Sequence, residues 1–211
     1  DTTHGGEGGL RVGYGIRRPL LRFDVGAIPA GSRVRQATLS LYSNWHNRSQ
    51  PMGVGAYALE RGWAERQVTW YQAAAGEPWQ VPGAEGAGDR ALAPASRVVL
   101  SDAQGWIRWD VTAIVQSWLD GENRGLILIP DNTTVEYTFY AREYTGNPDL
   151  RPRLEVQYVL PTPIPTATAT PLPTATAAAT ATAAPSPSAT PTAEPPPARW
   201  GPLYMPLIVR R

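Results

Sequence analysis

The chain of 211 residues contains no cysteine, and its 19 basic residues are all arginine because the sequence has no lysine. Without cysteine there are no disulfides, no thiol catalysis and no thiolate metal sites. The 18 acidic residues leave a net charge of +1, which argues against nucleic acid or an anionic membrane as the main partner. No stretch approaches the roughly 20 apolar residues of a membrane span. What precedes the low-complexity tail is long enough for one domain with its own core.

Residue patterns typical of catalysis are also missing. The two histidines, His4 and His46, lie in polar contexts and form no Ser-His-Asp or Cys-His arrangement. Several carboxylates could in principle form a glycosidase pair, but pairing with the many arginines is the favoured interpretation. These carboxylates are Glu60, Glu65, Asp110, Glu143 and Asp149. No acidic cluster has the ligand spacing of a calcium site, so the sequence predicts no enzyme, no metal and no cofactor.

The chain divides into three parts by composition. Residues 1–160 carry nearly all the bulky apolar residues and form the predicted domain. Residues 161–199 are almost wholly Pro, Thr, Ala and Ser, and such a segment cannot bury a core. Residues 200–211 are an apolar strand candidate closed by two arginines. The opening at Asp1, in a polar Gly-rich run, is typical of a mature terminus after removal of a signal peptide, and with the tail it predicts an extracellular or cell-surface protein.

Residues 1–160 read as all-β, because runs of branched and aromatic residues alternate with Gly, Pro, Asn and Asp. The predicted strands are Leu10–Tyr14, Leu20–Val25, Val34–Tyr42, Val54–Leu59, Val68–Trp70, Val98–Leu100, Trp106–Asp110, Leu126–Ile129, Thr134–Ala141 and Arg153–Val159. The run Leu126–Ile129 is apolar on both faces and predicts a central strand. The spacing of apolar residues over Asp110–Gly121 predicts one short helix. The fold class is therefore a jelly-roll-like two-sheet β-sandwich with one helix.

The order of motifs in this domain resembles the DNRLRE-type domain, a secreted bacterial β-sandwich related to an alginate-binding carbohydrate-binding module. The motifs are LRVG at 10–13, RRPLLRFDVGAIPAG at 17–31, ATLSLY at 37–42, WAERQVTW at 63–70, WDVTAIVQSWLDG at 109–121, GLILI at 125–129, and ARE at 141–143 followed by RPRLEVQY at 151–158. The resemblance implies an extracellular sandwich without catalysis, in which Arg142, Glu143 and Arg151 form structural pairs. The Pro/Thr-rich tail with its YMPLIV motif is similar to the ends of secreted surface proteins of thermophilic filamentous bacteria.

The resemblance also implies that one strand is missing before LRVG, while the chain carries a surplus apolar strand at its other end. This strand could insert into its own domain or into a neighbouring copy, in the donor-strand mode. The predicted assembly residues are Leu203, Tyr204, Met205, Leu207, Ile208 and Val209. Pro202 and Pro206 cannot donate ladder hydrogen bonds, so the strand must lie at a sheet edge or carry an irregularity.

Eight tryptophans are many for this length, and Trp and Tyr rings are the usual platforms for sugars. Trp45 and Trp79 lie in loop-like segments and are the predicted platforms. The other tryptophans in recognisable strand or helix motifs are predicted to be core residues: Trp63, Trp70, Trp106, Trp109 and Trp118. Glycosylation is predicted at Asn47 and Asn132 from the acceptor pattern and in the tail, at Thr166, Thr168, Thr170 and Thr174.

Two functions follow from these patterns. The first is an extracellular structural protein that polymerises head to tail through its C-terminal strand, with copies of itself as partners. The alternative is a secreted, non-catalytic carbohydrate-binding module on a Pro/Thr-rich tether, with a polysaccharide as partner.

Overall fold

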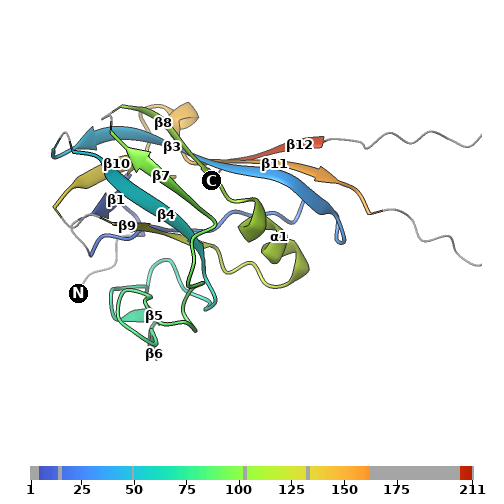
Figure 1. Ribbon diagram of the computed structural model, residues 1–211, viewed down its shortest axis with the longest axis horizontal. Helices are drawn as coiled ribbons and strands as arrows, with labels where there is room; N and C mark the ends of the chain where they lie inside the picture. The colour runs from blue at the N-terminus through green and yellow to red at the C-terminus, as the bar shows by residue number, and fades with distance from the viewer. Residues whose placement is uncertain are drawn as a thin grey trace, which may run out of the picture. The chain divides into compact units, whose positions relative to one another are not determined.

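The computed structural model describes residues 5–13, 16–48, 50–101, 104–131 and 134–161, together with the backbone of residues 205–210. These residues form two antiparallel β-sheets with one short α-helix, α1 (Thr112–Asp120), which confirms the predicted fold class (Figure 1). Successive strands mostly alternate between the two sheets, as in a jelly-roll-like sandwich. A 3₁₀ turn, η1 (Pro148–Leu150), and a small two-stranded ribbon of β5 (Gln72–Ala74) and β6 (Glu77–Pro78) complete the described elements.

The first sheet is organised around its longest strand, β3. β1, β10, β3, β11 and β12 follow one another by pairing, and β8 pairs with the opposite edge of β3. Along one edge of β3, its first residues pair with β11 and its last residues pair with β10. The other edge of β3 pairs with β8 over Thr38–Ser43. The strands are β1 (Gly9–Gly13), β3 (Arg33–His46), β8 (Gly105–Asp110), β10 (Glu136–Tyr140), β11 (Arg153–Val159) and β12 (Met205–Arg210).

The second sheet has the order β2-β9-β4-β7. Its strands are β2 (Leu20–Leu21), β4 (Met52–Ala58), β7 (Ser96–Leu100) and β9 (Leu126–Pro130). β9 lies between β2 and β4, which confirms the prediction of a central strand. Its residues are buried on both faces: Leu126 and Leu128 belong to the main core, and Ile127 belongs to a second apolar cluster.

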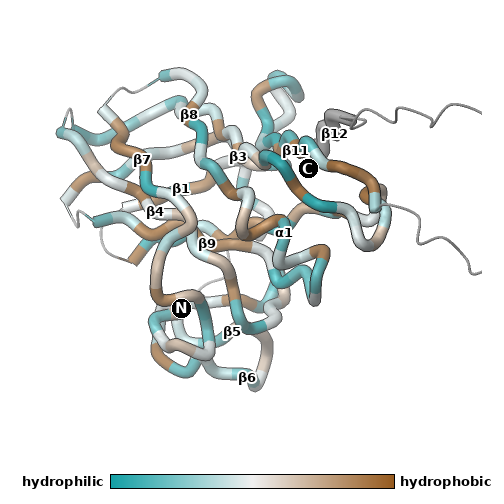
Figure 2. The backbone as a smooth tube through the Cα atoms, turned by 45° about the vertical axis from the view of Figure 1, so that its right-hand side comes forward, coloured by the Kyte–Doolittle hydropathy of each residue, from teal (hydrophilic) through white to brown (hydrophobic). Residues whose placement is uncertain are grey.

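The main core lies between the sheets and follows from the two-residue period of the strands. On β3, Leu39 and Leu41 point inward and are fully buried, as their alternation with Thr38 and Ser40 predicted. Trp109 of β8 is also fully buried, and its Nε1 donates a hydrogen bond of 2.9 Å to the carbonyl of Val54 in the opposite sheet. Figure 2 shows hydrophobic and hydrophilic residues interleaved along several of the strands.

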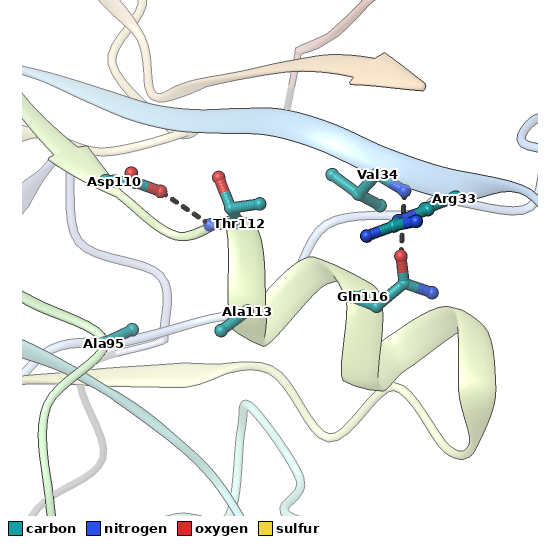
Figure 3. Close-up of a pocket in the computed structure, with 7 residues that line it drawn as sticks. All are labelled: Arg33, Val34, Ala95, Asp110, Thr112, Ala113 and Gln116. Carbon is teal, nitrogen blue, oxygen red and sulfur yellow. Dashed lines mark hydrogen bonds between the residues drawn. The ribbon is translucent and has the colours of Figure 1, made fainter. Parts of the chain in front are cut away.

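Helix α1 protects the part of the β3 edge that β8 does not reach. Val34 N donates to Gln116 Oε1 at 2.8 Å, and Ala37 N donates to Thr112 Oγ1 at 2.9 Å, so two helix side chains replace a neighbouring strand. Asp110 Oδ1 accepts from Thr112 N at the start of α1, whereas the cap residue itself is Val111, which makes no side-chain capping hydrogen bond. Val34, Asp110, Thr112 and Gln116 are among the residues that line an open pocket of about 410 Å³. Figure 3 shows these four side chains and the hydrogen bonds from Thr112 N to Asp110 and from Val34 N to Gln116.

The excursion between β4 and β7 has a small core of its own. It buries Leu59, Trp63, Ala73, Trp79 and Ala84 against Ile127. The fully buried carboxylate of Asp89 accepts hydrogen bonds from three backbone N–H groups, those of Gln80, Val81 and Gly86, and lies 3.3 Å from Arg61 Nε. A buried charge with this many donors holds the loops around it.

The predicted strand Val68–Trp70 is wrong, because this segment turns back on itself. Val68 N donates to Ala64 O and Thr69 N donates to Gln72 O, which uses the backbone groups of the segment locally. The predicted strand Leu20–Val25 is shortened to β2 because Asp24 Oδ1 accepts from Gly26 N and starts a turn.

β12 pairs antiparallel with β11 from Arg153↔Arg210 to Tyr158↔Met205, and it is the terminal strand of the sheet (Figure 1, β12 in red beside β11). The edge position confirms what Pro206 predicted for this strand. β12 and β1 lie on the same side of β3, because β11 and β10, with which they pair, share one edge of that strand. β12 therefore extends the sheet at β11.

We predict that Thr112→Val destabilises the fold by about 1–3 kcal/mol, because it leaves the N–H of fully buried Ala37 without its acceptor. Urea denaturation followed by circular dichroism measures the change. Thr112→Ser keeps the hydroxyl and should remain close to wild type. Equal stability of the Val and Ser variants would show that the hydrogen bond to β3 contributes nothing.

Candidate carbohydrate-binding face

The outward face of the first sheet carries a row of aromatic side chains. Since Leu41 points into the core, its neighbour Tyr42 points outward. Tyr42 is the register partner of Trp106 on β8, and their rings pack edge to face with centroids 5.4 Å apart. On the other side, the ring of Tyr140 from β10 stacks on Tyr42 at 5.9 Å. These three half-buried rings come from three neighbouring strands.

Tyr144 extends this row from the loop after β10. Its ring stacks on Tyr140 with centroids 3.7 Å apart. The loop is held by Tyr144 N donating to Ala141 O and by Arg151 Nε donating to the carbonyl of Tyr144 at 2.8 Å. A hydrogen bond with Tyr140 raises the pKa of the Tyr144 hydroxyl. We call Trp106, Tyr42, Tyr140 and Tyr144 the aromatic strip.

Trp45 lies on the same face, further along β3. Thr138 is its register partner, whereas Phe139 pairs with Ser43, so Asn44 is the extra residue of a β-bulge. Because Phe139 and Ser43 are fully buried, Thr138 and its partner Trp45 point outward. Trp45 is 49% exposed, and a sugar platform requires an exposed ring of this kind.

Charged residues form two cross-strand rows beside the aromatic strip. Arg108, Ser40 and Arg153 are register partners across β8, β3 and β11, and we call them the basic row. The guanidinium of Arg153 lies 4.5 Å from the ring centroid of Trp106, so the basic row adjoins the aromatic strip. Two positions further along, Asp110, Thr38 and Glu155 form an acidic row. The face is therefore graded from aromatic to basic to acidic.

Of the two predicted sugar platforms, only Trp45 is open to solvent. The prediction for Trp79 is wrong, because its ring is buried. Trp79 is 5% exposed in the second core, and its Nε1 donates to Thr69 O at 3.0 Å. The turn at 64–72 folds over this ring, which no local pattern in the sequence indicated.

The prediction of core positions is confirmed for three tryptophans, Trp63, Trp109 and Trp118, which are buried. Trp70 and Trp106 are only half-buried, so the prediction that they are core residues is wrong for both. Trp106 lies on the outward face of the first sheet. The alternation along Trp106–Asp110 contained the necessary signal, because Trp109 inside requires Trp106 outside.

The predicted modification and assembly sites fall largely outside the described residues. Asn132, Leu203, Tyr204 and the four tail threonines Thr166, Thr168, Thr170 and Thr174 lie outside them. Met205, Leu207, Ile208 and Val209 are described as backbone of β12. Asn47 joins two loops: its Oδ1 accepts from Glu136 N at 2.8 Å, and its Nδ2 donates to Thr134 O at 3.4 Å. A glycan on Asn47 would have to leave both bonds in place.

The carboxylates that could have suggested catalysis are partly bound to arginine. Arg142 lies 2.8 Å from Glu143 and 3.3 Å from Glu65, which confirms the structural pairing expected for the ARE motif. Glu85 contacts Arg18 at 2.5 Å and Arg90 at 3.2 Å; burial alone would raise its pKa, but hydrogen bonds and the charges of these two arginines lower it.

Among the described residues, no three His, Asp or Glu side chains gather as metal ligands. The helix that the described part of the chain contains is too short and too polar to cross a bilayer.

We predict that Tyr140→Phe lowers the pKa of Tyr144 toward its ordinary value, because the substitution removes the hydroxyl partner that raises it. The pH titration of the Tyr144 ring signals in NMR spectra measures the change. Tyr71→Phe, which alters a tyrosine in the excursion between β4 and β7, is the control and should leave the titration unchanged. An unchanged Tyr144 pKa in Tyr140→Phe would mean that the two rings do not pair in solution.

Comparison with known proteins gives one family match. Residues 1–81 match the sequence model of carbohydrate-binding module family 96. No curated protein matches the chain. The matched part contains β3 with Tyr42 and Trp45, whereas Trp106, Tyr140 and Tyr144 lie beyond it. Residues 1–81 of this β-sandwich are thus similar to carbohydrate-binding modules, which are typically non-catalytic.

Proposed function

We propose that the protein is a secreted, non-catalytic module that binds polysaccharide on the outward face of its first sheet. The observation that carries this proposal is the aromatic strip with Trp45, five rings gathered on one face from β3, β8, β10 and the loop after β10. Three of these rings stack or pack on Tyr42 or Tyr140, which fixes their orientation before any ligand arrives. Preorganised aromatic rings bind at low entropic cost.

The class of polysaccharide is indicated by the basic row. Arg108 is exposed, and Arg153 is anchored over Trp106 with its Nη2 donating to the carbonyl of Asp149. Guanidinium groups bind carboxylates with two parallel hydrogen bonds. Rings for the pyranose faces beside arginines for carboxylates suit an acidic polysaccharide. The resemblance to a relative of an alginate-binding module supports the same choice.

The Pro/Thr-rich segment 161–199 has the role of a tether in this proposal. In polyproline geometry, at about 3.1 Å per residue, such a segment spans roughly 120 Å. In the sequence this segment connects the domain to the C-terminal strand.

We predict that Trp45→Ala weakens binding of alginate by about thirty-fold, because an aromatic anchor contributes roughly 2 kcal/mol at the centre of a binding face. Tyr42→Ala should weaken it at least as much, since Trp106 and Tyr140 both pack on Tyr42. Affinity electrophoresis and isothermal titration calorimetry, with alginate compared against a neutral glucan, measure the effect.

The matched control is Tyr71→Ala, which removes a ring that is 61% exposed on the excursion between β4 and β7. This variant should bind like wild type. Thermal unfolding of all variants separates lost binding from lost folding. Retention of full affinity by Trp45→Ala and Tyr42→Ala would overturn the proposed site, and failure of the wild type to bind any polysaccharide would overturn the proposed function.

A second candidate function is favoured by the position of β12. As the terminal strand of the sheet, β12 pairs through its backbone along one edge only, and the same six residue pairs could form between two copies. Passing β12 to β11 of the next copy would build a head-to-tail filament, because such contacts repeat without closing.

The filament candidate predicts concentration-dependent assemblies of the full chain in light scattering and fibres with a regular repeat in electron micrographs. A synthetic peptide of residues 200–211 should compete for β11 and shorten the assemblies. A scrambled peptide of the same composition is the control. A monomer at every concentration tested would contradict this candidate.

A further inference from the structure

The side-chain amide of Asn44 lies on the outward face of the first sheet, between two of the proposed platforms. Leu41 and Ser43 are fully buried in the core. Because side chains alternate along a strand, Tyr42 and Asn44 point outward. Continued alternation would bury Trp45, but Asn44 is the extra residue of the β-bulge and Trp45 points outward as well. The bulge therefore places an amide and an open ring next to each other on one face.

This amide makes no hydrogen bond to another residue in the described part of the chain. Its Oδ1 is buried there without a partner, whereas its Nδ2 is not buried. The hydrogen-bonding capacity of Asn44 is therefore unused within the domain. A polar group that stays unpaired lowers the stability of the fold, so its place on the binding face points to a contact with a ligand.

Along β3, the amide and the basic row lie on opposite sides of the aromatic strip. Ser40, the centre of the basic row, precedes Tyr42 by two residues, and Asn44 follows Tyr42 by two. Same-face neighbours along a strand are roughly 7 Å apart. The strip itself runs across the strands through Tyr42. A polysaccharide that lies along the strip therefore has arginines beside one edge and the amide beside the other.

This arrangement matches the two edges of a 1,4-linked uronic acid residue. The polymer chain passes through C1 and C4, the carboxylate stands at C5 on one side, and the hydroxyls at C2 and C3 stand on the other. When the ring lies over Tyr42 with its carboxylate toward the basic row, these hydroxyls face Asn44. Hydroxyls both donate and accept hydrogen bonds, and a half-turn of the amide presents either of its groups to them.

We infer that Asn44 is a specificity-determining residue that recognises the C2 and C3 hydroxyls of a 1,4-linked uronate polymer. This inference rests on the proposed function and narrows it. Rings and arginines bind acidic sugars in more than one orientation, whereas a polar group placed among apolar ones fixes the orientation of the ligand. A site that bonds a hydroxyl also discriminates against ligands in which that hydroxyl is blocked or absent.

The experiment measures the affinity of the full chain for alginate and for alginate acetylated at these hydroxyls, by isothermal titration calorimetry. Asn44→Ala should weaken alginate binding about three- to tenfold, the range of one hydrogen bond between neutral groups. Acetylation should weaken binding by the wild type. The loss on acetylation should be about three- to tenfold smaller in Asn44→Ala, because the contact that acetylation removes is already gone.

Two further variants make the test specific. Gln36→Ala is the matched control, because it removes an exposed amide from the same strand and face, eight residues away, and it should behave like wild type with both polymers. Asn44→Asp keeps the shape of the side chain but carries a negative charge. It should therefore bind alginate more weakly than Asn44→Ala, and the difference should shrink as salt is raised. The urea midpoint of Asn44→Ala should equal or exceed that of wild type, since no hydrogen bond to another described residue is lost.

The outcomes separate this inference from the proposed function. If Asn44→Ala matches wild type in alginate affinity or in the loss on acetylation, the role of Asn44 is overturned, and the binding face tested by Trp45→Ala and Tyr42→Ala stands or falls separately. A lower urea midpoint together with weaker binding would assign Asn44 a structural role and would also overturn the inference. If wild type binds no polysaccharide, the proposed function falls and the inference falls with it.

Discussion

The two edges of β3 are the constraint on which the rest of the structure depends. This strand is bonded by β10 and β11 along one side, and by β8 and two side chains of α1 along the other. With both edges satisfied, β3 cannot slip by one residue, because a slip would turn Leu39 and Leu41 to solvent. The same register that buries these leucines presents Tyr42 and Trp45, so the core and the proposed binding face are fixed by one pairing pattern.

The inward face of the first sheet contributes to stability, and its outward face carries the proposed binding residues. The inward side chains of β3 and β8, such as Leu39 and Trp109, contribute apolar burial, whereas their outward neighbours are free to carry rings and charges. The edges differ in a similar way. Side chains of α1 occupy part of one edge of β3, whereas the outer edge of β11 pairs with β12, which follows the Pro/Thr-rich segment in the sequence.

Sequence reasoning succeeded where a signal is local and failed where distant segments decide exposure. The two-residue period identified most strands, the helical period identified α1, and the missing N–H of Pro206 identified an edge strand. Trp79 looked like a loop residue but is covered by the turn at 64–72, and Trp106 looked like a core residue but faces outward. In both cases burial depends on what folds over the ring, and composition near the ring carries no information about that.

The sequence by itself determined the sandwich class, the central position of β9, and the outward direction of residues that alternate with core leucines. These follow from steric and hydrophobic rules that act within a few residues. Only the tertiary structure decided that Tyr42, Trp106, Tyr140 and Tyr144 meet in one strip, that Arg108 and Arg153 share a row, and that β12 extends the sheet at β11. Strand order joins segments more than a hundred residues apart, and it is set by the best total burial and backbone pairing of the whole chain.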